Sequence, residues 1–545
     1  MKNWWNKNLW WCLFLLVVII YFWPYYRLGL PVTHDGENHV ARFAQYYLAF
    51  KQGQIIPRLA PSLQNGFGYP VFNFNYPLAN ILSLPLSMAK IHYELSFKLI
   101  VVFFYLMGGL GVWQWLKKII PELKKPVIPL LSFWLAPYLF QAIFYRGNIG
   151  EAMSFCLVPL ILWQIERKRE NSKGSSWLLL VLLASFFLSH NIMVLLLTPL
   201  LFCYAWWRLK TKNTKINFLM TVLVAIGLTL WFWLPALGEK SLIVLDGAGV
   251  NQEFAKHFID WQQLFKLNLS RGFSEVGMVD GLGYGLGLVF VMGWLINLML
   301  LTEKKYFYNH KINIILVIIS ILLIFIQTSG SQWWWKNIPF LNYVQFPWRW
   351  SLLLNLCLVW QLALIKNNHK GQKVFWACLF LIQGLLMINA WPKEFFTKTR
   401  DDYWSYPQTT TILGENRPKS FTYEITKGHS GQPLILVGEG EIKQIEKNNN
   451  TIKKYQLDCQ ASKCLIVEET AYFIGYETKI NGELINYVDG KEINGRIAFE
   501  VSRGNYQIVT KFTQKTWARL LGNGLLILSL MILFWRRKKI NHNQW

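Results

Sequence analysis

Residues 176–207 read SWLLLVLLASFFLSHNIMVLLLTPLLFCYAWW. As one helix, this stretch would be about 48 Å long at 1.5 Å per residue, which exceeds the roughly 30 Å hydrocarbon core of a bilayer. Lys/Arg clusters at 166–173 and 208–215 flank it. Because such clusters mark the cytoplasmic side of a membrane protein, both ends lie on one face. The sequence therefore predicts two spans joined by an outer turn at Ser189-His190-Asn191.

The rest of the chain follows the same pattern. Of its 545 residues, 53% are hydrophobic and only 16% charged, and the apolar residues lie in blocks of span length separated by basic clusters. We therefore predict a mainly α, polytopic membrane protein with both termini cytoplasmic. The aromatic run 22–26 follows the first block where a cleavage site would stand, which favours an uncleaved signal-anchor. About twelve transmembrane helices are expected, at 9–26, 95–116, 126–144, 150–165, 176–189, 192–207, 217–235, 283–301, 312–328, 350–365, 374–391 and 516–535.

The formal net charge of +25 has the same explanation. Seven segments expected on the cytoplasmic side hold 24 of the 55 Lys and Arg residues but only four of the 30 acidic ones. This asymmetry sets the orientation in the membrane. The basic balance therefore predicts no nucleic-acid partner, and membrane lipids are the expected surroundings.

Three regions are predicted along the chain. Residues 1–391 form the transmembrane domain, with a long first outer loop at 27–94 in which the apolar stretch 77–88 lies at the interface or re-enters the membrane. Residues 392–515 contain short β-rich runs at 423–426, 434–437, 454–457 and 506–512, with turn signals at Asn481-Gly482 and Asp489-Gly490. They predict a small extracytoplasmic β-rich domain, a sandwich or barrel. Residues 516–545 supply the last span and a basic cytoplasmic tail.

Two of the seven cysteines fall in the predicted β-rich domain. Cys459 and Cys464 stand five positions apart in a polar segment expected outside the cytoplasm. A local disulfide fits that oxidising side, whereas a zinc site would need further ligands nearby.

The first outer loop holds the richest polar cluster, residues 34–39 (HDGENH). If a helix begins near Asp35, then Asp35, His39 and Arg42 share one face at i, i+4 and i+7. An acid beside an imidazole and a guanidinium forms a general base with a partner, or one side of a metal site. The alternative is an N-cap followed by a solvated stripe. Glu37 points to another face and is the second candidate for the base.

A Gly/Pro/aromatic run with interleaved asparagines follows in the same loop, at residues 65–77. Its Tyr69, Asn73 and Asn75 suit a sugar or lipid headgroup, because rings cover apolar faces and amides reach hydroxyls. The alternative is an interfacial aromatic belt.

Ionisable residues also stand at the expected outer ends of several spans. Arg146 and Glu151 flank one turn, and His190 and Asn191 form another. Such residues are costly near a membrane and indicate function. However, His190 also suits a helix cap. Arg349 lies among aromatic residues, where it either clamps an anionic phosphate or snorkels to the headgroups.

With these residues, the chain resembles a bacterial and archaeal membrane family, labelled 6-pyruvoyl-tetrahydropterin synthase-related, that looks like a GT-C type glycosyltransferase. The matching residues are His34-Asp35, His39, Pro57-Arg58, 67–74, Arg146-Gly147, Glu151, 188–191, 232–237 and 346–349. Residues 471–476 (AYFIGY) resemble a tail that typically reads Tyr-Phe-Pro-Gly-Trp, from which Ile474 and Tyr476 depart. The label does not imply pterin chemistry, because pterin synthases are small soluble enzymes with a three-histidine zinc site.

The resemblance implies an integral enzyme of the bacterial inner membrane with an extracytoplasmic active site. Such enzymes move a sugar from a polyprenyl-phosphate donor to an acceptor, here a glycan, lipid or protein. Asp35 would be the general base, with inversion at the anomeric carbon, and Arg58, Arg146 and Arg349 would meet the donor phosphate. Arg42, Tyr69, Asn73, Asn75 and Asn191 are then candidates for substrate binding. If the loops converge, His34 or His39, Glu151 and His190 would ligate a divalent ion such as Mg, Mn or Zn.

Two other hypotheses remain open. A transporter or flippase for lipid-linked glycans would favour charges at mid-membrane and paired broken helices, whereas the charges here gather at span ends. A non-enzymatic envelope assembly protein would use the β-rich domain for docking and would not require Asp35.

Overall fold

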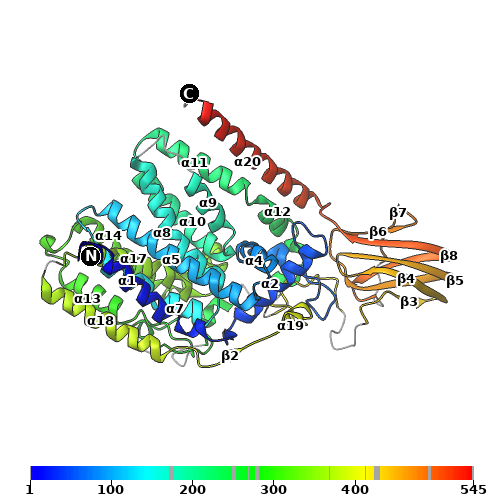
Figure 1. Cartoon of the computed structure of the whole chain (residues 1–545), viewed down its shortest axis with the longest axis horizontal. Helices are drawn as coiled ribbons and strands as arrows, with labels where there is room; N and C mark the ends of the chain where they lie inside the picture. The colour runs from blue at the N-terminus through cyan, green and yellow to red at the C-terminus, as the bar shows by residue number, and fades with distance from the viewer. Residues whose placement is uncertain are drawn as a thin grey trace. The chain divides into compact units, whose positions relative to one another are not determined.

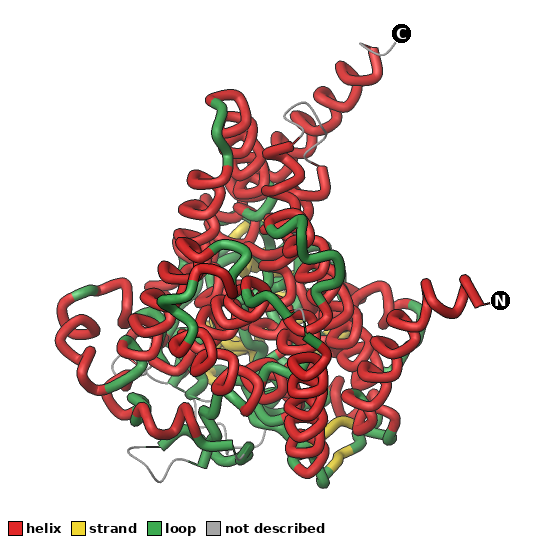
Figure 2. The backbone as a smooth tube through the Cα atoms, turned by 90° about the vertical axis from the view of Figure 1, so that its left-hand side faces the viewer, coloured by secondary structure: helices red, strands yellow, loops and turns green. Residues whose placement is uncertain are grey.

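Helices dominate the fold (Figure 2). The computed structural model describes residues 2–170, 177–247, 253–267, 269–275, 281–367, 369–411, 413–422, 430–488 and 493–542. The chain divides into two compact units. The first unit comprises Met1–Glu37, Glu94–Leu219 and Asn251–Thr397, and the second comprises Asn38–Tyr93, Met220–Val250 and Lys398–Trp545.

Within its described ranges, the first unit has helices and one short strand pair, β1 (Leu30–Pro31) with β2 (Phe395–Phe396). Its helices are labelled in Figure 1 where there is room. They are α1 (Lys2–Tyr21), α6 (Val127–Trp134), α7 (Pro137–Phe144), α8 (Ile149–Glu170), α9 (Trp177–Phe187), α10 (Asn191–Arg208), α13 (Leu288–Met299), α14 (His310–Phe325), α15 (Gln332–Asn337), α16 (Pro339–Asn342), α17 (Ser351–Leu364) and α18 (Lys370–Asn389). A boundary between the units falls within α2 (Gly36–Lys51), α5 (Tyr93–Ile119) and α11 (Lys212–Gly227).

Short 3-10 turns connect many of these helices. They are η1 (Trp23–Tyr26), η2 (Lys240–Leu242), η3 (Val244–Gly247), η4 (Glu253–Lys256), η5 (Trp261–Phe265), η6 (Lys304–Tyr306), η7 (Ser329–Ser331) and η8 (Pro347–Trp350). Of these, η8 places Arg349 directly before α17.

Among the described residues, six helical stretches are long and apolar enough to cross a membrane. The number rises to eight if each of two bent helix pairs forms one span. The bends measure 62° between α11 and α12 (Leu230–Gly238) and 89° between α14 and the segment Ser329–Asn337. Each of the twelve predicted spans overlaps a helix. Several of those helices, such as α9 and α13, have too few residues to cross a membrane by themselves. The count of twelve spans therefore stays a prediction.

The predicted hairpin at 176–207 corresponds to α9 and α10. The helices are separated at 188–190, where the sequence predicts the turn. His190 is the N-cap of α10, and its Nδ1 accepts a hydrogen bond from the Met193 backbone at 3.3 Å. The histidine therefore does cap a helix, which was one of the two hypotheses for it.

The core of the first unit is built around α8, whose residues are almost all buried. Phe133 of α6 stacks on Phe155 of α8 with ring centroids 4.8 Å apart. Helix α5 approaches α8 closely at Gly111, where a Cβ would lie 2.7 Å from the Leu160 nitrogen. This packing fixes the middle of α8 against α5 and α6.

The second unit combines short helices with a sheet. Helices α12 and α20 (Trp517–His542) pack side by side (Figure 1). The approach is close because a Cβ at Gly522 would lie 2.6 Å from the Leu230 carbonyl oxygen. The other helices are α3 (Val71–Phe74), α4 (Leu78–Met88) and α19 (Arg400–Trp404).

The six-stranded antiparallel sheet has the order β3-β5-β8-β6-β7, and β4 also pairs with β5. The strands are β3 (Leu434–Val437), β4 (Gly440–Asn448), β5 (Ile452–Ala471), β6 (Tyr476–Ile480), β7 (Glu483–Leu484) and β8 (Arg496–Phe512). Of the predicted runs, 434–437 is β3, while 454–457 and 506–512 lie in β5 and β8. The run 423–426 and the turn Asp489-Gly490 lie outside the described residues.

The long strand β5 bends back on itself. Tyr455 donates a hydrogen bond of 3.1 Å to Glu468, although a straight strand would hold residues thirteen positions apart at about 43 Å. The pairing with β8 shifts between Cys459 and Lys463, and Cys459 and Cys464 form a disulfide at this bend. One sheet therefore folds over a core that contains Leu457, Ile466, Phe499 and Ile508.

The tip of the β4–β5 hairpin is buried at Asn450 and Thr451. Asn450 is 7% exposed, and its side-chain amide donates to the carbonyl oxygens of Pro61 at 2.6 Å and Gly66 at 2.5 Å. Gln54 donates to Thr451 at 2.9 Å. The sheet is thus tied to residues 54–66 within the second unit.

Candidate functional site

The site begins where the chain enters α2. The backbone nitrogens of His34 and Asp35 donate to the carbonyl oxygens of Tyr145 and Arg146 at 3.0 and 2.7 Å. The helix begins at Gly36, close to the predicted start, and the Asp35 side chain is half-buried. The entry segment is therefore fixed to the turn before α8.

Gly147 makes this contact possible. Its φ is +61°, and a Cβ there would lie 2.3 Å from Thr33 Oγ1 and 2.7 Å from the Gly36 nitrogen. Any other residue would force the two segments apart. This explains why the motif Arg146-Gly147 belongs to the resemblance.

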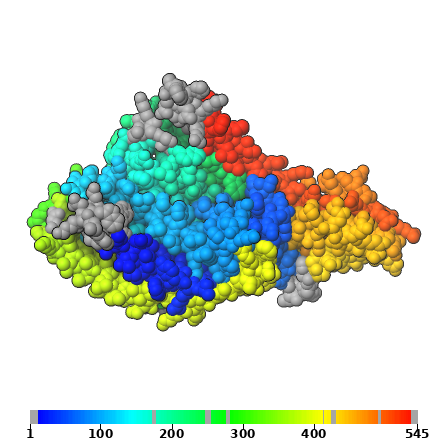
Figure 3. All heavy atoms as spheres, viewed as in Figure 1, coloured from blue at the N-terminus to red at the C-terminus, as the bar shows by residue number. Residues whose placement is uncertain are grey.

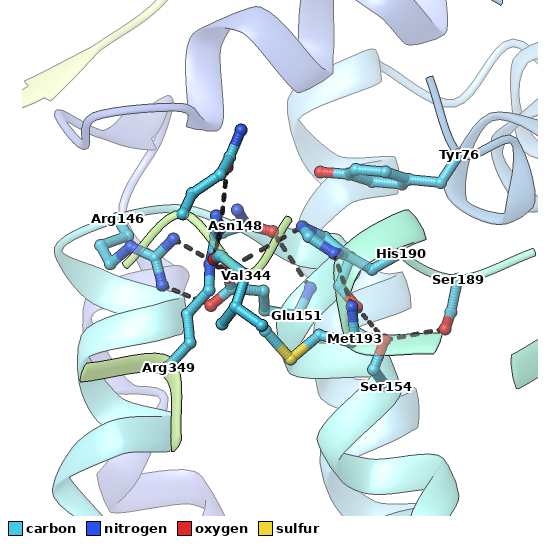
Figure 4. Close-up of polar contacts among 12 residues, drawn as sticks. Tyr76, Arg146, Asn148, Glu151, Ser154, Ser189, His190, Met193, Val344 and Arg349 are labelled. Atoms are coloured by element: carbon cyan, nitrogen blue, oxygen red, sulfur yellow. Dashed lines mark hydrogen bonds and ion pairs between the residues drawn. The ribbon is translucent and has the colours of Figure 1, made fainter. Parts of the chain in front are cut away.

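Beside this turn, two guanidinium groups converge on one buried carboxylate (Figure 4). Arg146 bonds both oxygens of Glu151, with Nη2 to Oε1 at 3.0 Å and Nη1 to Oε2. Arg349 donates from Nε to Oε1 at 3.0 Å. Tyr138 donates to Oε2 at 2.9 Å. Glu151 itself is fully buried.

Each partner of Glu151 is held by its own element. Asn148 accepts a hydrogen bond from the Glu151 nitrogen at 3.0 Å, which caps the first turn of α8. Arg349 also donates at 2.8 Å to the Val344 carbonyl oxygen and to Gln345. The Arg146 guanidinium lies 4.4 Å from the centre of the Trp348 ring. The aromatic run 346–350 thus positions both arginines.

His190 completes what we call the Glu151 cluster: Glu151, Arg146, Arg349 and His190. Its Nε2 lies 3.9 Å from Glu151 Oε1. Burial lowers the pKa of His190 to about 3; the two guanidinium groups act in the same direction, and Glu151 opposes them. The imidazole is therefore neutral at pH 7. One carboxylate and two guanidinium groups leave the cluster with a net charge of +1.

The three predicted metal ligands His34, Glu151 and His190 do not form one group, although Glu151 and His190 lie close together. Among the described residues, no group of three or more His, Cys, Asp or Glu side chains is arranged to hold a metal ion. His34 instead bonds the Arg271 carbonyl oxygen at 3.0 Å and stacks on Phe273 with ring centroids 4.3 Å apart. Glu151 is occupied by arginines. This geometry does not fit a divalent ion on His34, Glu151 and His190, and the need for a metal remains untested.

Three further predicted residues lie outside the Glu151 cluster. Glu37 is half-buried in the first turn of α2, and Asn191 is the first residue of α10. His39 belongs to the second unit, where Tyr76 approaches its Nε2 at 3.3 Å.

Several predicted substrate-binding residues meet in the second unit. Arg42 donates to Asn75 at 3.2 Å and to the Thr410 hydroxyl at 3.2 Å. Tyr69 is fully buried, and its hydroxyl bonds Thr411 at 2.7 Å. Thr410 and Thr411 therefore complete this group, and no sequence pattern indicated that they take part.

A second buried ion pair was missed by the sequence analysis. Glu239 accepts hydrogen bonds from Arg519 at 2.8 Å, Thr516 at 2.6 Å and Asn73 at 2.9 Å. We call these four residues the Glu239 cluster. The predicted substrate-binding Asn73 thus bonds a carboxylate of the protein, and it is fully buried.

The AYFIGY segment supports this cluster. Arg519 donates to the Ile474 carbonyl oxygen at 2.9 Å. Gly475 has a φ of +107°, and a Cβ there would lie 2.3 Å from Arg519 Nη1. The glycine that this chain shares with the related tails is therefore required by the close approach of Arg519.

Of the three arginines predicted to meet a donor phosphate, the structure brings Arg146 and Arg349 together. Arg58 lies in the second unit and is fully buried. It donates to the Trp231 carbonyl oxygen at 2.6 Å and to Gln514 at 3.2 Å. Burial, and next the charge of Arg519, lower its pKa. Its contacts fit a structural role in the second unit.

The apolar helices, the buried charges near their ends and the appended sheet define a polytopic helical membrane protein. The chain belongs to the family described as "6-pyruvoyl-tetrahydropterin synthase related domain; membrane protein", which matches residues 72–396. This confirms the family resemblance.

Two individual proteins are also similar to the chain. An uncharacterized protein of Lactococcus lactis subsp. cremoris (strain MG1363) is 22% identical over 279 residues, which cover 47% of this chain and 45% of that protein. The chain therefore matches less than half of the length of this relative. The cryo-EM structure of the arabinofuranosyltransferase AftD from Mycobacteria matches with a TM-score of 0.43 and 13% identity, covering 69% of this chain and 26% of that one.

Proposed function

We propose that the protein is a GT-C type glycosyltransferase of the bacterial inner membrane. It moves a sugar from a polyprenyl-phosphate donor to a glycan, lipid or protein acceptor at the extracytoplasmic face, and both of its termini are cytoplasmic. The observation that carries the proposal is the pairing of the Asp35 backbone with the Arg146 turn. This pairing supports the idea that the half-buried Asp35 carboxylate borders the Glu151 cluster, which has a net positive charge.

The proposed reaction is a single nucleophilic displacement in which the Asp35 carboxylate and the positive Glu151 cluster both take part. Asp35 takes the proton of the acceptor hydroxyl as its oxygen bonds the anomeric carbon. The bond from that carbon to the phosphate oxygen breaks, the electron pair leaves with the lipid phosphate, and the carbon is inverted. The leaving group is an anion, so fixed cations stabilise it without a general acid. Arg146 and Arg349 are our candidates for that role.

The other predicted residues have secondary roles in this proposal. Glu37 is the second candidate for the base, and His39 is the candidate partner. Arg42, Asn75 and Asn191 are the candidates for substrate binding. Asn73 and Arg58 support the fold instead.

A transfer assay tests the proposal. Cells producing the protein are labelled with a radioactive sugar, and label is followed from the lipid-extractable fraction into acceptor material. The Asp35→Asn variant is expected to lose transfer by about 10²–10⁴-fold, as expected for loss of a general base. Glu37→Gln separates the two candidate bases: it should retain most activity if Asp35 is the base, and a loss of transfer in this variant alone would assign the base role to Glu37.

The same assay separates the alternatives. Unchanged transfer in Asp35→Asn, with normal amounts of protein, would rule out Asp35 as the base. Transfer that is absent in the wild type, together with movement of lipid-linked sugar across the membrane, would replace the proposal with a flippase.

A further inference from the structure

A cavity of about 270 Å³ lies in the first unit, lined from α13 and α18 and the segments that flank them. Its walls are mainly apolar and aromatic, and they include Ile296, Leu300, Ile365, Phe375 and Trp376. The Trp376 indole nitrogen donates to Asn367 at 2.8 Å. Its polar atom is therefore satisfied, and the buried ring adds apolar surface to the cavity wall. We call this space the α13–α18 cavity.

Two basic segments join at the edge of this cavity. The Lys366 nitrogen donates to the Tyr306 carbonyl oxygen at 2.9 Å, and the Tyr308 nitrogen donates to Leu364 at 2.9 Å. The Lys366 ammonium donates to the Lys305 carbonyl oxygen at 3.1 Å. Tyr306 and Lys366 both line the cavity. These bonds hold the two segments side by side.

Both of these segments are strongly basic. Residues 303–311 and 366–373 contain six lysines and a single acid, Glu303. Lys304, Lys305 and Lys370 are exposed, and Lys370 precedes Gly371, which lines the cavity. In Figure 3 the yellow-green atoms of α18 lie on the surface, in keeping with its many exposed side chains. An apolar cavity with cationic edges fits a ligand that combines an acyl chain with a negative headgroup.

We propose that the α13–α18 cavity binds an anionic phospholipid. An acyl chain occupies the space between Leu300 and Trp376, and the phosphate meets Lys366 and Lys370. A zwitterionic lipid would offset the lysine charge less, because a headgroup cation cancels its phosphate, and a free phosphate would leave the apolar walls empty. The apolar walls and the positive charge of the two segments together therefore favour an anionic phospholipid as the ligand.

Gly371 offers a direct way to block the cavity. A Cβ built there meets no atom within 4 Å, so a larger side chain enters open space. Gly384, on the same helix, is equally open and is not among the cavity residues. Gly371→Leu and Gly384→Leu therefore make the same substitution on one helix, the first in its opening turn and the second in its interior.

The test is lipid binding to the full-length protein in a neutral detergent, measured by native mass spectrometry. Dimyristoyl-phosphatidylglycerol is compared with dimyristoyl-phosphatidylcholine, which has the same acyl chains. We expect the anionic lipid to bind at least about fivefold more tightly, the gain expected from one lysine near a phosphate. Gly371→Leu should lose this binding, and Gly384→Leu should keep it.

A double variant, Lys366→Gln with Lys370→Gln, should lose the preference for the anionic lipid and keep its binding of the neutral one. Equal binding of the two lipids by the wild type would overturn the proposal, as would equal losses in the two glycine variants. Displacement of the lipid by millimolar inorganic phosphate would also overturn it, because the site would then be one for free anions. If Gly371→Leu does not fold, the lysine variant decides the question alone.

Discussion

The Glu151 cluster and the Glu239 cluster use the same chemistry in different surroundings. Each holds a buried carboxylate that accepts from guanidinium groups. Glu151 binds two arginines and lies beside the half-buried Asp35 loop, whereas Glu239 binds one arginine whose other bonds go to backbone carbonyls. The comparison teaches that a buried ion pair by itself does not mark a reaction centre. The half-buried carboxylate of Asp35 in the adjoining loop distinguishes the first cluster.

The largest expected effect is loss of the central carboxylate. Glu151→Ala leaves two buried guanidinium groups unpaired, and Glu239→Ala leaves one. Removing one partner of a buried pair costs about 3–5 kcal/mol. We expect both variants to unfold at lower temperature, with the larger drop for Glu151→Ala. Intrinsic tryptophan fluorescence during heating measures the two unfolding temperatures. A larger drop for Glu239→Ala would contradict the expected order of the two clusters.

Next in size is a test of function. Arg349→Lys keeps the charge but loses the bond from Nε to Glu151. If this arginine meets a phosphate, transfer per folded molecule should fall by about 10–100-fold, that is about 1.4–2.7 kcal/mol. Arg519→Lys alters the second cluster in the same way and should leave the rate per folded molecule within about twofold. Equal rate losses in the two variants would assign both clusters the same role.

The pH dependence of stability gives a third test. The folded-state pKa of His190 is about 3, below the unfolded value of about 6.5. Unfolding therefore takes up a proton below pH 6.5, and stability falls by about 1.4 kcal/mol per pH unit as the pH drops from 6 toward 4. Above pH 7 this group has no effect. His190→Gln should remove this component, and an unchanged acid slope would show that the imidazole is not held neutral.

The smallest expected effect concerns the support of the Glu239 cluster. Gly475 and Gly482 have φ values of +107° and +94°. A Cβ at Gly475 meets Arg519, whereas one at Gly482 meets no atom within 4 Å. Both alanine variants carry the backbone cost of about 1 kcal/mol. Gly475→Ala should cost about 1–2 kcal/mol more, measured as a larger drop in unfolding temperature. Equal drops would mean that Arg519 moves aside freely.

Much of the helical architecture followed from the sequence, because each span leaves a local signal in hydropathy and charge. The hairpin at 176–207 and the start of α2 are examples. The bend of β5 left no such signal, because a shift in pairing between Cys459 and Lys463 interrupts the alternation of side chains. The sequence therefore indicated short strands where one long strand runs.

The sequence indicated which residues belong to the candidate site, but it did not indicate which of them contact one another. Arg146, Glu151, His190 and Arg349 stood out because charges near span ends are costly. Their grouping was not predictable, since Arg349 is 198 positions from Glu151. The surroundings of His34 were equally unpredictable. Its actual partner, the Arg271 carbonyl oxygen, is 237 positions away.

The buried hairpin tip at Asn450 has a consequence for biosynthesis. Asn450 is 389 positions beyond Pro61, whose carbonyl oxygen it bonds. At 5–20 residues per second, a ribosome needs about 20–80 s to cover that distance. The segment 54–66 must therefore wait that long for its partner while the intervening spans are made. Its final structure is one of the last parts of the protein to be completed, although it is among the first to be synthesised.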